Sequence, residues 1–174
     1  MKKLIWNILI ILILFVVQIG ASVFFSVSWV LNLLIPFTII AVWLNTHQSI
    51  KYQLLPAAIL IDTLQTSKLP IMTITLLGVW LTVAIVENQW LTNRSVASLF
   101  GLALIGGIIR FALTGGLIGL AYLLNFSNTK PGSTWSGSQI GILFLIEFGI
   151  VFFGGLIANW LKKNIIQKSP YAKT

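Results

Sequence analysis

The chain has 174 residues, of which 57% are hydrophobic and 8% are charged, with a formal net charge of +8. Soluble domains carry about a quarter charged residues. This composition, with a mean hydropathy of +0.99, therefore excludes a soluble domain and indicates an integral membrane protein. The absence of cysteine excludes disulfides and thiolate chemistry. No basic stripe carries interleaved aromatic residues, so nucleic-acid binding is not predicted.

Apolar runs predict a single all-α transmembrane domain with about six membrane-spanning helices. Several runs reach the roughly 20 residues that cross a bilayer. The predicted spans are residues 4–20, 23–44, 53–66, 70–86, 95–124 and 139–161. An outer loop at residues 125–138 separates the last two spans, and a basic tail at residues 162–174 follows the last one.

The distribution of Lys and Arg predicts that both termini face the cytoplasm, in a multi-pass protein of the cytoplasmic membrane. Loops rich in these residues tend to stay on the inner side. Six crossings with an inner N-terminus leave only Lys68 and Lys130 outside. The inner group then comprises Lys2, Lys3, Lys51, Arg94, Lys162, Lys163, Lys168 and Lys173.

Two of the predicted spans have alternative interpretations. The break between the first two helices is placed at residues 20–22 (GAS), with Asn32 and Pro36 as a rival break. The first segment also has the pattern of a cleaved signal peptide, with residues 20–22 as the small-residue site. Residues 53–66 are short for a full crossing, and a run of this size is also typical of a re-entrant segment.

Catalysis is not predicted, and neither is a metal or a cofactor. The lone histidine, His47, and the acidic Glu87 both fall in predicted inner loops, where they are expected to be solvated. No second histidine and no pair of carboxylates at helical spacing is present, so neither a zinc site nor an acid/base dyad can be assembled from neighbouring residues.

Arg110 and Glu147 are charged residues inside predicted spans, where ionisable groups are costly and usually paired or functional. Counting from the outer ends at 1.5 Å per residue, Glu147 lies about 12 Å deep and Arg110 about 20 Å deep. We therefore expect a structural ion pair between the fifth and sixth helices, with Asp62 as the second candidate partner of Arg110. The alternative is that Arg110 contacts a substrate or an ion.

Glycines at a spacing of four residues predict close helix packing in the last two spans. Small residues let membrane helices approach closely. The pairs are Gly115 with Gly119 and Gly137 with Gly141.

Three short motifs occur in a recognisable order along the chain. Residues 32–36 (NLLIP) place a proline in the second helix, residues 56–70 (PAAILIDTLQTSKLP) place an aspartate before a short polar turn and a proline, and residues 91–95 (LTNRS) precede the fifth helix. In these motifs the chain resembles the MreD family of bacterial rod shape-determining membrane proteins. It departs from the family pattern at Phe37, Ala58 and Ile71, and residues 139–161 have no match.

The resemblance implies a six-helix fold similar to the substrate-binding subunits of energy-coupling-factor vitamin transporters. It also implies a non-enzymatic scaffold in peptidoglycan elongation, which acts through helix and loop contacts with an MreC-like bitopic protein and the wall-synthesis machinery. Asp62, with Gln65, Lys68 and Pro70, would orient the outer turn or contact a partner.

Two other functions are compatible with the residues. The first is a small-molecule-binding membrane subunit of a transporter, with an outer pocket lined by Asp62, Gln65, Asn125 and Trp135. The second is a membrane component of an unrelated assembly.

Overall fold

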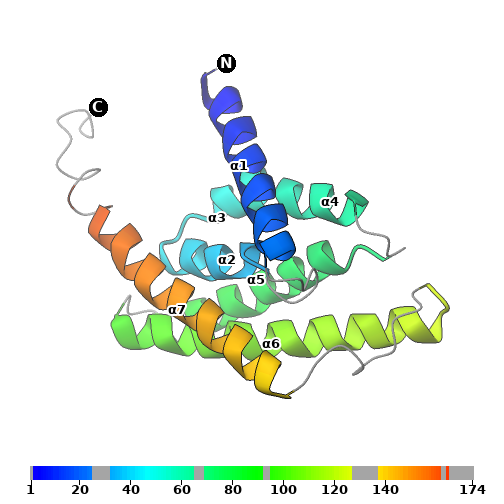
Figure 1. The fold of residues 1–174 in the computed structure, drawn as a ribbon. Helices are drawn as coiled ribbons and strands as arrows, with labels where there is room; N and C mark the ends of the chain where they lie inside the picture. Colours follow the sequence, from blue (N-terminus) through cyan, green and yellow to red (C-terminus); the bar gives the residue numbers. More distant parts are fainter. Residues whose placement is uncertain are drawn as a thin grey trace.

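The structure, a computed structural model, describes residues 2–24, 32–64, 69–91, 95–126, 137–161 and 164. Every regular element in these ranges is a helix, as the predicted fold class requires (Figure 1). The elements are α1 (Lys2–Phe24), α2 (Leu34–Trp43), α3 (His47–Ser49), the π-helix η1 (Ile50–Leu54), α4 (Leu55–Leu64), α5 (Ile71–Gln89), α6 (Val96–Leu123) and α7 (Gly137–Leu161).

Three helices in the described part of the chain are long and apolar enough to cross a membrane. They lie at Ile71–Gln89, Val96–Leu123 and Ile140–Leu161, in the positions of the last three predicted spans. The predicted number of six crossings and the orientation of the termini stay predictions.

The short helix α2 forms the centre of the fold. It packs against α5, α6 and α7, and all of its residues except Phe37 are buried. Because ten residues rise about 15 Å, α2 spans only about half of a bilayer's hydrocarbon core. Its core contacts come mainly from apolar side chains of the three long helices, among them Leu76, Val79, Val83, Leu99, Leu102 and Val151.

The predicted break at residues 20–22 is wrong, because α1 continues through them to Phe24. A single glycine costs a helix only about 1 kcal/mol, which a long apolar run tolerates. The predicted second span, 23–44, therefore starts too early. The helix α2 begins at Leu34, just after Asn32, which was the rival break. The side-chain Oδ1 of Asn32 accepts a hydrogen bond of 3.1 Å from the N–H of Leu34, which makes Asn32 a helix-start residue. Residues 25–31 lie outside the described part.

Asparagine ends both α2 and α6. Asn45 and Asn125 each have a φ of 55°, in the left-handed region that asparagine tolerates. In each case the next N–H bonds back to a carbonyl five residues earlier, Thr46 to Ala41 and Phe126 to Ala121, both at 2.8 Å. This Schellman geometry satisfies carbonyls left free at a helix end. The end of α6 therefore coincides with the predicted start of the outer loop.

The predicted span 53–66 belongs to a longer helical stretch. The elements α3, η1 and α4 follow one another without a gap from His47 to Leu64. Pro56 has no N–H, so it cannot complete an α-helical bond to the carbonyl four residues earlier. The π-helical residues Ile50–Leu54 lie directly before it, where the regular hydrogen-bond ladder is already interrupted.

Two residues expected to be solvated are not. Glu87 is only 8% exposed, because α5 continues to Gln89 and places Glu87 on the same face as the buried Val79 and Val83. His47 is half-buried at the start of α3, and its Nδ1 accepts a hydrogen bond of 3.4 Å from the indole N–H of Trp80.

The first helix crosses η1 and α4 and is tied to the fold by two polar contacts. The amide of Gln53 donates to Oδ1 of Asn7 at 3.1 Å, and Oε1 of Gln18 accepts from the N–H of Leu33 at 2.8 Å. The opposite face of α1 is exposed and apolar, as expected for a helix that contacts lipid. It carries Ile5, Ile8, Leu9, Leu12, Ile13, Val16 and Val17.

Candidate functional site

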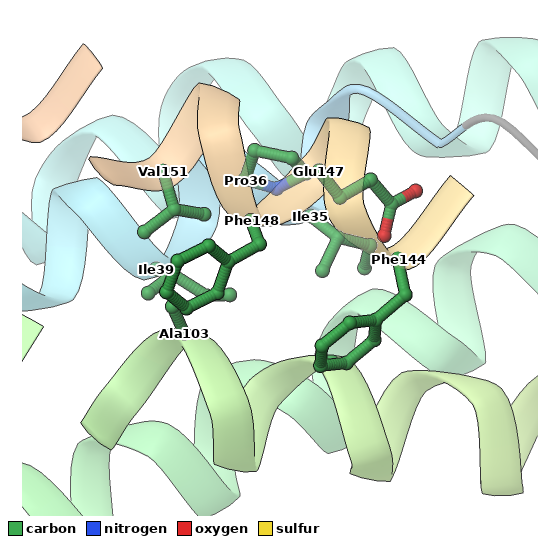
Figure 2. A pocket seen from close by; sticks show the side chains of 9 residues that line it. Ile35, Pro36, Ile39, Ala103, Phe144, Glu147, Phe148 and Val151 are labelled. Atoms are coloured by element: carbon green, nitrogen blue, oxygen red, sulfur yellow. The ribbon is translucent and has the colours of Figure 1, made fainter. Parts of the chain in front are cut away.

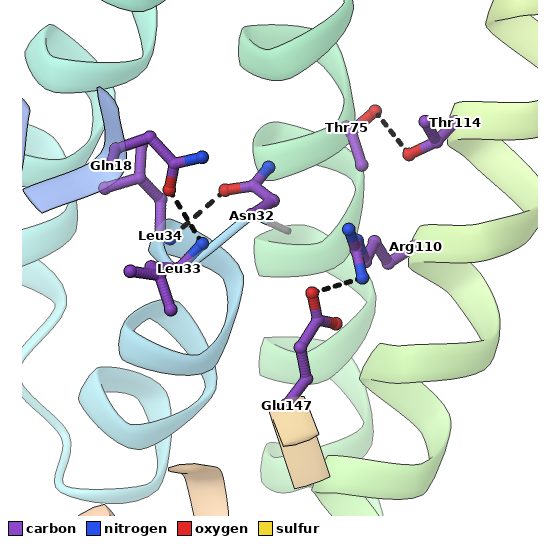
Figure 3. A network of polar contacts seen from close by, with 8 residues as sticks. All are labelled: Gln18, Asn32, Leu33, Leu34, Thr75, Arg110, Thr114 and Glu147. Carbon is purple, nitrogen blue, oxygen red and sulfur yellow. Dashed lines mark hydrogen bonds and ion pairs between the residues drawn. The ribbon is translucent and has the colours of Figure 1, made fainter. Parts of the chain in front are cut away.

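The side chains of Arg110 and Glu147 form an ion pair between α6 and α7 (Figure 3). Both residues are buried, with 2% and 5% of their surface exposed. Arg110 lies near the middle of α6, and its Cζ atom is 4.7 Å from the ring centroid of Phe111, within the range of a cation–π contact. The structure thus brings together the two residues that the sequence pairs, and buries both of them.

A close approach of α7 to α6 makes this pair possible. The Phe144 ring, one turn before Glu147, lies against Gly107, one turn before Arg110. A Cβ atom built on Gly107 would be 2.6 Å from the Phe144 ring, so any other residue would require the ring to shift. Gly107 therefore allows α7 to approach α6 closely, one turn from the ion pair.

The start of α2 lies close to the same carboxylate, because Ile35 and Pro36 line a small cavity together with Glu147. The neighbouring backbone donors are satisfied, since Leu33 donates to Gln18, Leu34 to the Asn32 side chain, and Ile35 to the Asn32 carbonyl at 3.2 Å. Pro36 has no N–H to satisfy.

Non-helical backbone at membrane depth is tolerated only where its polar groups are buried and bonded within the protein. We call Gln18, Asn32, Arg110 and Glu147 the polar cluster; its members come from α1, the start of α2, α6 and α7 (Figure 3). Its contacts join α1 to the start of α2, and α6 to α7.

A second polar contact lies one turn along α6 from Arg110. The hydroxyl groups of Thr75 and Thr114 are 3.4 Å apart and buried, and they link α5 to α6. Gln18, Thr75 and Thr114 were not predicted from the sequence, and Asn32 was considered only as a rival helix break. Their only signal is that each is a polar residue within an apolar run, which in a membrane protein indicates an internal partner.

A small cavity lies beside Glu147, between α2, α6 and α7 (Figure 2). Its volume is about 10 Å³, close to the space that one water molecule occupies. Glu147 is its only charged lining residue, and Phe144, Phe148 and Val151 of α7 face Ile35, Pro36, Ile39, Ala103 and Gly107 across it. The cavity suits a water molecule and is much smaller than the pockets that take up organic ligands.

Asp62 does not contact Arg110. Its carboxylate instead accepts hydrogen bonds from the N–H of Met72 at 3.0 Å, the N–H of Thr73 at 2.7 Å and the Thr73 hydroxyl at 2.6 Å. These N–H groups belong to the first turn of α5, which begins after Pro70. Asp62 therefore caps the next helix from across the turn, where a negative charge is favourable.

The remaining residues predicted for this turn and for an outer pocket are only partly described. Gln65, Lys68 and Trp135 lie outside the described part of the chain. Asn125 is exposed at the end of α6 and takes the left-handed conformation that closes the helix.

Two of the predicted packing glycines, Gly115 and Gly141, do not pack against a neighbour inside the described part of the fold. A Cβ built on Gly115 or Gly141 meets nothing within 4 Å. Gly119 is half-buried, and Gly137 is the first residue of α7. The close contacts instead involve Gly106 against Ile39, Gly107 against Phe144, and Gly155 against Leu99. A spacing of four residues does not show which face of a helix meets a neighbour.

Within the described residues, no group of three or more His, Asp or Glu side chains lies close enough to hold a metal ion. Comparison with protein-family models, with curated proteins and with solved structures finds no match to this chain.

Proposed function

We propose that the chain is a non-enzymatic integral membrane scaffold of a cell-wall elongation complex, related to the MreD family. It would lie in the bacterial cytoplasmic membrane, cross it about six times with both termini inside, and act through helix and loop contacts with a bitopic partner and wall-synthesis enzymes. Three long apolar helices and a lipid-compatible face on α1 support a multi-pass membrane protein.

The observation that carries the proposal is that three buried or half-buried charges are used within the fold. Glu147 binds Arg110, and Asp62 caps α5. An intramembrane charge otherwise indicates a substrate or ion contact. Here Asp62, Arg110 and Glu147 each have a protein partner, while the buried Glu87 lies near the end of α5, and this favours a role carried by the outer surfaces of the helices.

The Asp62 cap also gives a physical reason for the motif on which the resemblance rests. The motif has an aspartate, a polar turn and then a proline, and in this chain the aspartate binds the first N–H groups after that proline. An α4–α5 hairpin fixed in this way holds its turn in one orientation, as a docking element requires.

One observation favours the alternative, a small-molecule-binding subunit of a transporter. The helix α2 begins with buried residues, and its first turn lines the cavity beside Glu147. Transporters place substrate and ion sites at such internal helix ends. In this chain the nearby carboxylate of Glu147 is paired with Arg110.

Affinity purification of the tagged full-length chain from its native membrane in mild detergent tests the proposal. Mass spectrometry of the eluate should find a single-span membrane protein and wall-synthesis enzymes, and these should be absent when an unrelated multi-pass protein is purified in the same way. Recovery of a stoichiometric small molecule or an ATPase module would instead establish the transporter function.

A further inference from the structure

The helical stretch formed by α3, η1 and α4 is held to α5 by a polar contact at each of its ends. At the C-terminal end, Asp62 caps the first turn of α5. At the N-terminal end, Nδ1 of His47 accepts a hydrogen bond of 3.4 Å from the indole N–H of Trp80. Both His47 and Trp80 are half-buried. The stretch is therefore fixed at two points, and one of them is a histidine.

The contact at His47 exists only while the imidazole is neutral. An indole N–H can donate but cannot accept, so Nδ1 of His47 carries no proton when it faces Trp80. In a protonated imidazole both ring nitrogens are donors, and two donors would then face each other. Histidine is the side chain whose charge ordinarily changes between pH 5 and pH 8, and His47 is the only histidine of the chain. Acid therefore removes this contact.

Few other titratable groups lie on the elements around His47. The adjoining η1 carries Lys51 and Tyr52, both exposed, and α5 carries Glu87, seven residues after Trp80 and so about 10 Å further along the helix. The helix α2, which also contacts α3, has no titratable side chain. The charge on His47 itself is thus the one that acts directly on the contact.

We propose that His47 and Trp80 form a pH-sensitive contact, which holds α3 and η1 against α5 and releases them when the imidazole is protonated. The stretch can bend at η1, because its π-helical bonds already interrupt the α-helical ladder. The Asp62 cap keeps α4 in place. Release is therefore confined to the end of the stretch that also carries the hydrogen bond from Gln53 to Asn7 of α1. This inference does not rest on the proposed function.

Melting temperature measured against pH tests the contact. The purified full-length chain in detergent is compared with His47→Asn, whose amide oxygen still accepts a hydrogen bond but does not titrate, and with Trp80→Phe, which removes the donor. From about pH 8 to about pH 5, we expect the wild type to lose about 2–4 °C more than either variant, as the loss of one hydrogen bond does in a chain of this size. An equal loss in His47→Asn would overturn the proposal. A wild-type loss in Trp80→Phe would overturn it too, since His47 would then act without Trp80.

Glu87→Gln is the control for the other buried titratable group of α5. This variant should keep the pH profile of the wild type, because the contact between His47 and Trp80 is unchanged. A flat profile in Glu87→Gln would assign the effect to Glu87 and overturn the proposal.

A spin label tests the release itself and does not depend on melting. The chain has no cysteine, so Ser49→Cys in α3 and Thr63→Cys in α4 each carry a single nitroxide. Acid should raise the mobility of the label at position 49 and not of the label at position 63, and adding His47→Asn should abolish the rise. Unchanged mobility at position 49 would overturn the release of α3. An equal rise at both positions would show general unfolding and would overturn it as well.

Discussion

Arg110 and Glu147 neutralise each other where neither is solvated, so removing one leaves the other as an uncompensated buried charge. We expect Arg110→Leu or Glu147→Leu alone to lower the free energy of unfolding by about 3–5 kcal/mol. The double variant should recover much of that loss, because two apolar side chains of similar volume replace the pair. Equilibrium unfolding in detergent of the four proteins checks this cycle. Losses that simply add in the double variant would mean that the two side chains do not interact.

Asp62 acts on a helix other than its own, so its replacement should weaken the start of α5. We expect Asp62→Ala to cost about 1–2 kcal/mol in the free energy of unfolding, as loss of a cap does. Asp62→Asn should cost less, since an amide oxygen still accepts a hydrogen bond.

Thr63→Ala is the matched control for this change. Thr63 is exposed on the same helix and bonds only to the carbonyl of Leu60, at 2.7 Å. Its replacement should change stability by no more than about 0.5 kcal/mol. If the Asp62→Ala protein were as stable as the Thr63→Ala control, Asp62 would not stabilise the start of α5.

At the scale of single residues, charges could be paired from the sequence and neutral polar groups could not. Arg110 and Glu147 are opposite charges in neighbouring apolar spans, and burial leaves them few other partners. Gln18 and Asn32 are uncharged, so no residue of opposite charge indicates what they bond to. Asp62 was assigned to the outer turn. The sequence does not show that its carboxylate accepts hydrogen bonds from backbone N–H groups and not from a side chain or a partner.

Packing between α6 and α7 distinguishes two classes of glycine. We expect Gly107→Ala to destabilise by about 1–3 kcal/mol, because the added methyl group meets the rigid Phe144 ring. Gly115→Ala, with open space around it, should be neutral or slightly stabilising because alanine favours the helix. Thermal unfolding of the two variants in one detergent checks the contrast. Equal losses would show that helix propensity, and not the Phe144 contact, determines the effect.

The long helices were predictable because an unbroken apolar run that is long enough to cross a bilayer is stable there as an α-helix. The ends of α6 and α7 match their predicted spans within about two residues, the usual uncertainty of helix ends. The bounds of the first two helices were not predictable, because residues 4–50 contain no charge to mark a loop. There the break depends on Asn32, whose side chain bonds to its own backbone, and not on the small residues 20–22.

The topology of the whole molecule is predicted from where its basic residues lie, and the chain is suited to a direct test. It has no cysteine, so each single-cysteine variant carries one thiol. We expect Ser133→Cys in the predicted outer loop to react with a membrane-impermeant maleimide in intact spheroplasts. Ser169→Cys in the basic tail should react only after lysis. Labelling of Ser169→Cys before lysis would place the C-terminus outside and change the number of crossings.

We propose that the intramembrane charges maintain the fold while the outer helix surfaces and loops carry the function. The most direct measurement is partner capture by the neutral pair, Arg110→Leu with Glu147→Leu, in quantitative affinity purification beside the wild type. We predict that the folded neutral variant retains the same co-purifying membrane and wall-synthesis proteins at wild-type levels. A variant that folds and inserts normally but loses its partners would contradict the account and assign the function to the charge pair itself.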